Sequence, residues 1–506
     1  HASREGTGVE YEQQRRGDGE EMKTTKNQEE AAAMASAETG SPTAAHEALR
    51  RRHLQEMQAL APGHFERLSW SAERLHSERE ARLRTLVRYA CERSPWHRQR
   101  LAGIDPGILT EDDLPKLPVM TKDDLMWHFD EIVTDPRLTL EKVEAHLVSF
   151  AAGTDAYLLD RYHVVASSGS SGRRGVFVYD WRSWADCYLG HVRYALRELL
   201  RGSDPAVRGP VVMVVVAAEQ PTHLSGSLPR TFSNPTVMVT HRFPVTLPLE
   251  RIVAGLNGVR PDVLNGYPSV LHQLTFEAQA GTLEISPKSV NSVAEPLLPE
   301  IRSVLEETWA VPVHNWWSCS EGGPMAISCG LRRGMHLSDD LLIVEPVDAR
   351  GSAVPPGVPS AKVYLTNLYN PALPLIRYEI TDEVTLLEDH CPCGSAHRLV
   401  EDIQGRLDDT FFYPGLGAVH PHVFRSRLGR EHGIVEYQVR QTARGAAIAI
   451  RCRGEVDFAS LQADIAFYLA RLGLENPEVS AEPVESLDRH SSGKLKRFVP
   501  LAVGQR

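Results

Sequence analysis

Apolar residues recur along the chain with two different periods, and the change between them predicts where helices and strands lie. Between residues 47 and 99 they recur mostly every three or four positions, which predicts long helices that end at Ser94-Pro95. Thr121, which stands before a polar first turn, is the expected N-cap of another helix. Short apolar runs then alternate with helical stretches, and this alternation favours α/β layers.

The expected elements of this second region are short. Strands are expected at residues 211–218, 236–240, 263–265, 341–347, 361–367 and 383–388, and helices near residues 249–255 and from residue 269 onward. Near the end of the chain, residues 437–442 and 447–452 flank Arg444-Gly445 as a hairpin, and residues 458–472 form an amphipathic helix. The last hundred residues are therefore expected to form a separate small α+β unit.

These patterns divide the chain into three parts. Residues 1–46 lack periodic large apolar side chains, so we expect a disordered tail. Residues 47–407 are expected to form a large N-terminal α/β domain, and residues 408–506 a small C-terminal α+β domain. The boundary is expected near Asp408.

Composition excludes several classes of protein. With 42% hydrophobic and 24% charged residues, the chain of 506 residues is ordinary for a globular protein. Its net charge of -11 argues against nucleic acid as the main ligand. Because the longest apolar run is far shorter than a bilayer span and residues 1–46 hold no signal-like apolar core, we expect no membrane association and a cytoplasmic location. Seven cysteines in so long a chain do not indicate a disulfide framework, so a cysteine cluster indicates metal or chemistry.

One segment predicts an anion site. Small residues and arginines form the loop Ser167-Ser168-Gly169-Ser170-Ser171-Gly172-Arg173-Arg174-Gly175, which lies between two apolar runs. Backbone amides and hydroxyls of such a loop close around an anion, and a triphosphate is the natural guest. The loop lacks the Gly-Lys-Ser/Thr of a Walker loop, and taken alone it is equally compatible with a flexible surface loop.

A second set of residues indicates metal. Cys329, His336, Cys391 and Cys393 are the residue types that bind tetrahedral Zn²⁺. Their spacing is looser than that of a zinc finger, so spacing alone favours unrelated thiols over a site. The other four cysteines are expected to be small apolar fillers.

Further motifs follow the loop in a fixed order, and together they resemble a known superfamily. The motifs are Ala294-Glu295-Pro296, Asn315-Trp316-Trp317-Ser318-Cys319-Ser320-Glu321, Pro374-Leu375-Ile376-Arg377-Tyr378 with Asp382, Ile403-Gln404-Gly405-Arg406-Leu407-Asp408-Asp409, and Ser491-Ser492-Gly493-Lys494. This order is similar to that of the adenylate-forming superfamily. Ser94-Pro95-Trp96-His97-Arg98 and the connector at residues 117–125 resemble its phenylacetate-CoA ligase, or CapK-like, branch. The resemblance covers about residues 47–500.

The resemblance implies a nucleotide site. The loop from Ser167 to Arg173 would hold the β- and γ-phosphates of ATP, Asn315 would face the adenine amino group, and Trp317 would stack on the ring. Asp382 would accept the ribose hydroxyls, and Glu321, after Ser320, would coordinate Mg²⁺. Glu295 and Pro296 complete the nucleotide-binding set. The branch also implies that Cys329, His336, Cys391 and Cys393 together hold a structural Zn²⁺.

The resemblance further implies a moving active site. Arg406 would lie near the ribose and the α-phosphate, and Lys494 would bridge the acid and the α-phosphate during adenylation. Asp408 would be the hinge about which the small domain turns before a thiol acceptor enters. Trp316 and Tyr267 would line the acid pocket.

The chain departs from the family pattern at several positions. Arg173 stands where lysine is usual, and Trp317 replaces the usual tyrosine. Trp316 takes a place often held by a small or aliphatic residue, so we expect it to shorten or flatten the acid pocket. The segment 410–421 is about one residue longer than the branch pattern. Because the resemblance implies that this segment shapes the acceptor tunnel, the identity of the acceptor is the least constrained of these expectations.

The expected activity is that of an AMP-forming acid-thiol ligase. It would convert a small-molecule carboxylic acid, of an aryl or arylacetic type, through acyl-AMP to a CoA thioester, with release of AMP and pyrophosphate. The alternative keeps the adenylation and changes the acceptor to an amine, a carrier-protein thiol or another nucleophile. A third hypothesis is a nucleotide-binding or regulatory protein that has lost catalytic activity. The presence of the predicted catalytic and binding residues argues against it: Glu321, Asp382, Arg406 and Lys494. If the chain forms an oligomer, we expect a homodimer.

Overall fold

An eight-stranded mixed sheet forms the centre of the larger part of the chain in this computed structural model. The structure describes residues 44–154, 156–167, 175–201, 210–217, 221–232, 238–245, 247–329, 331, 334–403, 409–414, 416–419, 421–428, 431, 433–489 and 495–501. Its strand order is β13-β9-β8-β7-β6-β5-β3-β4. The strands are β3 (Val211–Ala217), β4 (Met238–Pro244), β5 (Val263–Gly266), β6 (Ser289–Val293), β7 (Val313–Cys319), β8 (Gly323–Ser328), β9 (Met335–Leu337) and β13 (Leu399–Val400).

Strand β7 is where parallel pairing changes to antiparallel pairing. From β4 to β7 neighbouring strands are parallel, whereas β8, β9 and β13 continue the sheet with antiparallel pairs. Crossover helices connect the parallel strands: α9 (Leu224–Phe232), α10 (Leu249–Val259), α11 (Pro268–Gln279) and α12 (Pro299–Trp309). Because the strands from β4 to β7 run in one direction, their carboxyl ends share one edge of the sheet.

Helix α8 (Trp181–Arg201) crosses beside the sheet and packs against the long helix α2 (Ala44–Arg67). The side chain of Arg193 in α8 donates to both carboxylate oxygens of Asp340 at 2.7 and 2.8 Å, and both residues are buried. A buried ion pair of this bidentate kind fixes geometry, because either charge alone would be costly to bury. The pair therefore joins α8 to the turn that precedes β10.

The remaining elements of the larger part surround this frame. The helices are α3 (Ala72–Arg93), α4 (Pro95–Arg100), η1 (Glu111–Lys116), α5 (Lys122–Trp127), α6 (Phe129–Ile132) and α7 (Leu140–Ala151). One small sheet pairs β1 (Tyr162–Ala166) with β2 (Val176–Asp180), and another holds β10 (Leu342–Val347), β11 (Lys362–Asn367) and β12 (Tyr378–Ile380). The expected cap is confirmed, because the Thr121 hydroxyl accepts from the backbone of Asp124. Helix α3 ends at Arg93 and α4 starts at Pro95, so Ser94 caps both.

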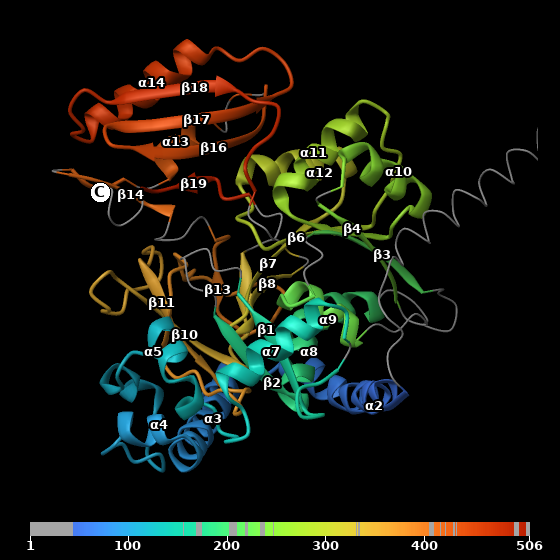
Figure 1. Ribbon diagram of the computed structural model, residues 1–506, viewed down its shortest axis with the longest axis vertical. Helices are drawn as coiled ribbons and strands as arrows, with labels where there is room; N and C mark the ends of the chain where they lie inside the picture. Colours follow the sequence, from blue (N-terminus) through green and yellow to red (C-terminus); the bar gives the residue numbers. More distant parts are fainter. Residues whose placement is uncertain are drawn as a thin grey trace, which may run out of the picture.

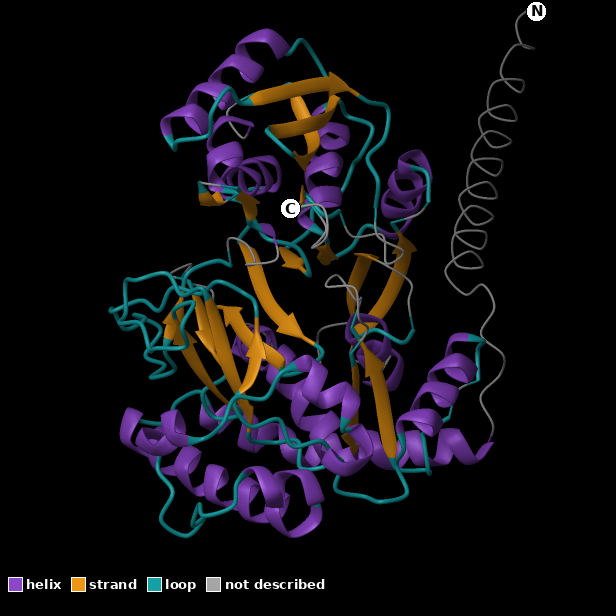
Figure 2. Ribbon diagram, turned by 60° about the vertical axis from the view of Figure 1, so that its left-hand side comes forward, coloured by secondary structure: helices purple, strands orange, loops and turns teal. Residues whose placement is uncertain are grey.

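The last part of the chain has its own sheet and its own core. Its elements are β14 (Phe411–Tyr413), β15 (Gly417–Val419), α13 (His422–Leu428), β16 (Ile434–Thr442), β17 (Gly445–Cys452), α14 (Phe458–Arg471), β18 (Glu478–Pro483) and β19 (Phe498–Val499). Figures 1 and 2 show this part above the carboxyl edge of the central sheet. The expected hairpin and helix are confirmed by β16, β17 and α14. The boundary at Asp408 stays a prediction, since residues 404–408 lie outside the described residues.

The strand expected at residues 383–388 is wrong. Only Leu386 forms an isolated bridge, with Val400. The backbone of Val384 donates to the side chain of Ser360, and the carbonyl of Leu386 accepts from Gly357. Apolar residues at 384, 386 and 387 mimic a strand pattern. Thr385 and Leu387 do bond to residues 401 and 399, but Val384 and Leu386 bond to the loop 357–360, so the pairing is limited to one bridge. The expected tail, apart from residues 44–46 of α2, lies outside the described residues.

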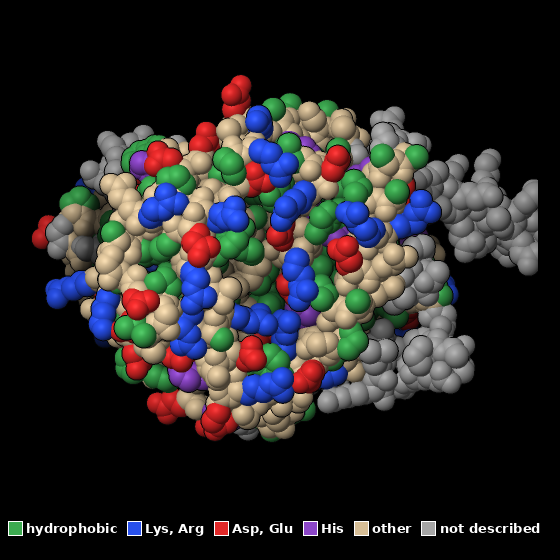
Figure 3. Space-filling model, turned by 90° about the horizontal axis from the view of Figure 1, so that it is seen from below, with side chains coloured by type: hydrophobic (Ala, Val, Ile, Leu, Met, Phe, Trp, Pro, Cys, Tyr) green, Lys and Arg blue, Asp and Glu red, His purple; other side chains and the backbone are tan. Residues whose placement is uncertain are grey.

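The face opposite the C-terminal part mixes charges of both signs. Seen from below, Lys and Arg side chains are spread across this face with Asp and Glu side chains between them (Figure 3). In this region Arg79 and His76 both pair with Glu111, and Arg84 pairs with Glu80. Mixed charge of this kind keeps a surface hydrated. Among the described helices, none combines the length and the apolarity needed to cross a bilayer.

Candidate active site

A cavity of about 1200 Å³ lies between one face of the central sheet and helices α8 and α9. Alternate residues of β3, β5, β6 and β7 form its floor. At the carboxyl edge of the sheet the cavity reaches Ser167, Ser320, Glu321 and Asp382. Parallel α/β sheets bind ligands at this edge. Several of the predicted nucleotide-binding residues thus lie at the mouth of one cavity, which continues deeper between the sheet and the helices.

Hydrogen bonds close the base of the predicted phosphate loop. The backbone of Gly175 donates to Oγ of Ser167 at 2.8 Å, and the backbone of Ser167 donates to the carbonyl of Gly175 at 2.9 Å. A side chain at Gly175 would meet the ring of Phe177 at 3.0 Å and Lys122 at 3.2 Å, so glycine lets the strand ends pack closely. The predicted ligands between them lie outside the described residues: Ser168, Gly169, Ser170, Ser171, Gly172 and Arg173.

Lys122 is a site residue that sequence reasoning treated only as part of a helix start. Its Nζ donates to Oγ of Ser167 at 3.4 Å, and it lines the cavity with its neighbours Thr121 and Asp123. The capping box of Thr121 and Asp124 fixes the first turn of α5, and so holds Lys122 beside the loop. A lysine directly after a predicted N-cap, in a connector near an anion loop, is the signal that could have found it.

Three hydrogen bonds hold the turn that carries Glu321. Tyr179 donates its hydroxyl to the carbonyl of Ser320 at 2.6 Å, and the amide of Asn367 donates to the carbonyl of Glu321 at 3.0 Å. Tyr369 donates to the next carbonyl, that of Gly322, at 3.0 Å. Burial raises the pKa of Tyr179 well above its ordinary value, so its hydroxyl stays protonated and keeps donating. With its backbone bound in this way, Glu321 is held at the cavity by a rigid turn.

Trp317 and Asp382 form a buried pair. The indole Nε1 donates to Oδ2 of Asp382 at 2.7 Å, and Asp382 is only 2% exposed. Because side chains alternate along a strand, Trp317 projects from the face of β7 opposite Trp316 and Ser318, which line the cavity. The carboxylate predicted to bind ribose is thus oriented by the residue predicted to stack on adenine.

Asn315 points to the same face of β7 as Trp317. Its Nδ2 donates to Oδ1 of Asp402 at 2.9 Å, and Arg302 donates to the other oxygen, Oδ2, at 2.7 Å. Asp402 is 87 residues away in sequence and was not predicted as a site residue. No local motif marks it, since only the fold brings it to Asn315.

Glu295 connects the two parts of the molecule. Its Oε2 accepts from the backbone of Ser269 at 3.2 Å, and its Oε1 accepts from the backbone of Leu495 at 2.9 Å. Pro296 follows it directly. Arg489 adds to this interface by donating to Ser269 at 3.4 Å and by pairing with Glu436. The predicted residues Arg406, Asp408 and Lys494 lie outside the described residues.

Only one of the two predicted acid-pocket residues, Trp316, lines the cavity. Trp316 is half-buried and lines the cavity, with its ring centroid 6.1 Å from that of His191. Since Nδ1 of His191 donates to the Cys187 carbonyl at 2.7 Å, its Nε2 accepts from Ser318 at 3.0 Å. Burial lowers the pKa of His191 to about 4, so its imidazole is neutral near pH 7 and adds no charge beside Trp316. Tyr267 is fully buried in the neighbouring core and is not among the cavity-lining residues.

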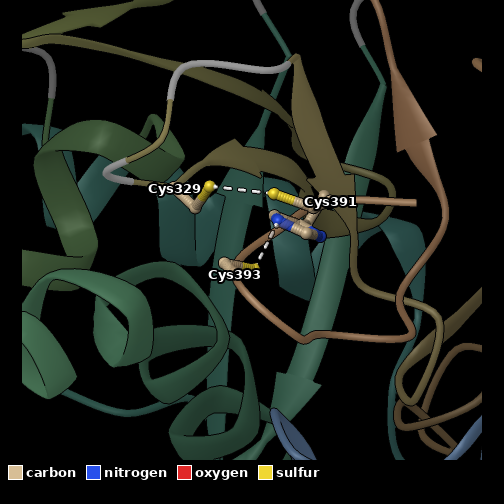
Figure 4. Close-up of side chains that lie close together, drawn as sticks. Cys329, Cys391 and Cys393 are labelled. Atoms are coloured by element: carbon tan, nitrogen blue, oxygen red, sulfur yellow. Dashed lines mark hydrogen bonds between the residues drawn. The ribbon is translucent and has the colours of Figure 1, made fainter. Parts of the chain in front are cut away.

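The four predicted zinc ligands converge. Cys329 follows β8, His336 lies in β9, and Cys391 and Cys393 lie in the turn before β13 (Figure 4). Their ligand atoms all lie within 4.8 Å of one another. Sγ of Cys329 is 3.5 Å from Sγ of Cys391, and Sγ of Cys393 is 3.4 Å from Nε2 of His336.

These distances fit a closed tetrahedral site. With metal-ligand distances of 2.0 to 2.3 Å, ligand atoms of a zinc tetrahedron lie roughly 3.5 to 3.8 Å apart. The two sulfurs are much farther apart than the roughly 2.05 Å of a disulfide. Nδ1 of His336 donates to the carbonyl of His397 at 3.3 Å, which leaves Nε2 to face the cluster. Three thiols and one imidazole therefore fit zinc, with no position left for a substrate.

Comparison with known proteins gives a consistent relationship. No family model matches the chain. The phenylacetate-coenzyme A ligase of Thermus thermophilus is 28% identical over 408 residues, which cover 78% of this chain and 82% of that protein. Protein CapK of Staphylococcus aureus is 23% identical over 60% of each chain. The crystal structure of a 2-hydroxyisobutyryl-CoA ligase in the postadenylation state has a TM-score of 0.67 at 20% identity, and covers 86% of this chain and 91% of that one.

The fold matches that of the 2-hydroxyisobutyryl-CoA ligase, with a large α/β part and a small C-terminal α+β part. The sequence is similar to the phenylacetate-CoA ligase and CapK branch. Both the fold class and the resemblance drawn from the motifs are confirmed.

Proposed function

We propose that this protein is an AMP-forming acid-thiol ligase, which activates a carboxylic acid with ATP and transfers the acyl group to coenzyme A. The observation that carries the proposal is the meeting, in one cavity, of the phosphate-loop base at Ser167, the turn with Glu321, and Asp382. Its similarity to phenylacetate-CoA ligase over most of the chain supports the same activity. An aryl or arylacetic acid is the proposed substrate class.

The proposed nucleotide site has one group for each part of ATP. Residues 167–173 would bind the β- and γ-phosphates, joined by the ammonium group of Lys122, which contacts Ser167. Asp382 would accept the ribose hydroxyls with its remaining acceptor capacity, while Trp317 orients it. Glu321 would hold Mg²⁺, a hard cation that prefers oxygen ligands and would neutralise phosphate charge.

The proposed reaction proceeds in two half-reactions. A carboxylate oxygen of the acid bonds to the α-phosphorus of ATP, and the bond to the bridging oxygen of the β-phosphate breaks, so pyrophosphate leaves. The sulfur of CoA then bonds to the acyl carbon, the bond to the AMP oxygen breaks, and the thiol proton passes to solvent. Lys494 and Arg406 would stabilise the negative charge that builds up at the α-phosphate in the first step.

A turn of the C-terminal part about Asp408 would separate the two half-reactions. The hydrogen bond from Leu495 to Glu295 supports this proposal, because it brings the segment that follows Lys494 to a loop of the nucleotide site. An acceptor needs a path to the acyl-adenylate, so this contact would open before transfer. Transfer to an amine or to a carrier-protein thiol remains the alternative outcome.

Zinc is the third part of the proposal. The ligands tie the strand ends of β8, β9 and β13 together beside the sheet, and Cys329 also borders the cavity. A closed tetrahedral ion there would supply stability to this edge of the sheet.

The test is acid-dependent pyrophosphate release, measured with ATP and Mg²⁺ across a library of carboxylic acids. Glu321→Gln should lower the rate by about two orders of magnitude or more, because it removes the proposed metal ligand. Glu388→Gln, an exposed carboxylate outside the cavity, is the matched control. Adding CoA, amines or a carrier protein in turn then identifies the acceptor by the product that accumulates with AMP. Absence of pyrophosphate release with every acid would overturn the proposal.

A further inference from the structure

Three polar side chains form one row across the floor of the cavity. In the ladder pairing of the parallel strands, Val215 lies opposite Asn265, Asn265 opposite Asn291, and Asn291 opposite His314. All four residues line the cavity. Residues directly opposite in neighbouring strands project from the same face and lie about 4.8 Å apart. Two amides and an imidazole thus form a continuous row of groups that are able to hydrogen-bond.

The two amides of this row are buried without hydrogen-bond partners. Asn265 is 8% exposed and Asn291 is 6% exposed. Among the described residues neither side chain has a hydrogen-bond partner, and Oδ1 of Asn265 is a fully buried acceptor. Buried polar groups in folded proteins are nearly always satisfied by protein, water or ligand. Two neighbouring exceptions on a cavity floor indicate that their partner comes from the contents of the cavity.

Many of the side chains next to the row are apolar. One step along the sheet toward its carboxyl edge lie Val293 and Trp316, and one step away lie Met213 and Val263. The facing wall comes from α8 and α9, and its apolar members include Leu189, Val192, Leu196, Leu228 and Phe232. Other polar residues also line the cavity, among them Ser289, two residues before Asn291 in β6, and Arg197 of α8, but neither belongs to the row.

The row lies deeper in the cavity than Trp316, and the cavity continues past it to Met213, Val263 and Ser289. Along β7 the cavity-facing residues follow the order His314, Trp316, Ser318, and the turn with Glu321 comes next. Two residues of a parallel strand span about 7 Å, so the row lies about that far beyond Trp316. A molecule whose carboxylate reacts near Glu321 would bring its far end, past Trp316, to the two amides.

We propose that the row of Asn265, Asn291 and His314 recognises a hydroxyl or amino group at the end of the acid remote from its carboxylate. This inference rests on the proposed adenylation of an aromatic acid and narrows its substrate class to ring-hydroxylated or ring-amino acids. Oδ1 of Asn265 accepts a hydrogen bond from that group, and the amide of Asn291 supplies both a donor and an acceptor. An acid without such a group leaves the amides unpaired, and this penalty gives the discrimination.

Matched pairs of acids test the proposal in the pyrophosphate-release assay. The pairs are 4-hydroxyphenylacetate with phenylacetate, 4-hydroxycinnamate with cinnamate, and 4-aminobenzoate with benzoate. The substituted member of at least one pair should have a kcat/KM higher by about tenfold or more, since hydrogen-bonding sites reject analogues that lack the bonding group. Asn265→Leu and Asn291→Leu should each remove this preference by lowering kcat/KM for the substituted acid.

Ser292→Ala is the matched control variant. Ser292 follows Asn291 in β6, is fully buried, and projects from the opposite face of the sheet, away from the cavity. Its substitution should leave the preference intact, and melting temperatures of all three variants check that they fold. Equal kcat/KM within every pair, or a preference that survives both leucine substitutions, would overturn this inference and leave the proposed function standing. Failure of every acid to release pyrophosphate would overturn both.

Discussion

The backbone amide of Leu495 donates a 2.9 Å hydrogen bond to Oε1 of Glu295. This bond joins the C-terminal part of the chain to the loop that follows β6, at the carboxyl edge of the central sheet. The other oxygen of Glu295 is bound to the first turn of α11, so the carboxylate is held in place from both sides. The arrangement is the one expected when the segment after Lys494 is docked for adenylation.

Lys494→Ala should slow the first half-reaction far more than the second. Its charge is proposed to act only while the acid attacks the α-phosphate, so acid-dependent pyrophosphate release should fall by roughly 10²- to 10³-fold. Thioester formation from synthetic acyl-adenylate and CoA should fall much less. Lys496→Ala, which removes a charge two residues away, should change neither rate by more than a few-fold. Equal slowing of both halves by Lys494→Ala would contradict either the lysine assignment or the domain alternation.

Asp408→Pro should have the converse effect. Proline fixes φ near -65° and so hampers rotation about the proposed hinge, while adenylation requires no rotation. Pyrophosphate release in a single turnover should persist, and transfer from the acyl-adenylate to CoA should become the slow step. Rapid-quench measurement of both half-reactions gives the comparison. Loss of the first half-reaction with retention of the second would place the hinge elsewhere.

Zinc removal should lower stability before it affects the chemistry. Protein purified without added zinc should contain one zinc ion per chain, and strong chelation should lower the melting temperature. Cys391→Ser should reproduce that loss, because it opens the tetrahedron, whereas Cys452→Ser in β17 should not. Elemental analysis together with thermal melts provides the measurement. A metal-free protein with an unchanged melting temperature would show that the thiols are only packed together.

Trp317→Phe should destabilise the protein by about 1–3 kcal/mol, the cost of leaving a buried acceptor with one donor fewer. The substitution keeps an aromatic ring and removes the N–H that reaches Asp382. Trp309→Phe is the control, since Nε1 of Trp309 has no hydrogen-bond partner within the described residues. Urea unfolding of both variants measures the difference. Equal stabilities would mean that the indole bond contributes nothing net.

Acidification should destabilise the protein through buried histidines such as His97. Burial lowers the pKa of His97 to about 3, and its Nε2 donates to the Pro374 carbonyl at 2.9 Å. The neutral form is favoured in the folded state, so its contribution is fully present above the unfolded pKa near 6.5 and is lost as pH falls toward 3. His97→Gln keeps a donor without titrating, so it should flatten the slope by up to about 1.4 kcal/mol per pH unit. Urea unfolding of both proteins across this pH range measures the slope, and an unchanged slope in His97→Gln would contradict the prediction.

Local patterns predicted those parts of the fold that local physics determines. The run of branched residues that forms β3 and the turn at Arg444-Gly445 carry their structure in a few neighbouring positions. Residues 383–388 carry an equally convincing apolar pattern, yet they form only one bridge, to Val400, and the other side of the segment bonds to the loop 357–360. Whether a strand pattern finds a partner depends on chain segments that the pattern itself does not contain.

The same limit applies to the site. Of the motif residues that the structure describes, Ser167, Ser320, Glu321 and Asp382 line one cavity, and the roles predicted for them stay predictions. The contact of Asn315 with Asp402 and the row through Asn265 and Asn291 depend on strand register between distant segments. A single sequence does not reveal which residues of two strands lie opposite each other. Lys122 was missed for a different reason, since its place in the first turn of α5, directly after the N-cap Thr121, concealed its position beside Ser167.

The alternation along β7 also limits how this protein can change during evolution. Asn315 and Trp317 lie on one face of the strand, and His314, Trp316 and Ser318 lie on the other. Insertion or deletion of one residue within β7 would exchange the two faces, so the residues proposed to bind the nucleotide would face the cavity and those proposed to line the acid pocket would face away from it. Point substitutions can alter acid preference and nucleotide contacts independently of each other, whereas a length change in these seven residues would disrupt both together.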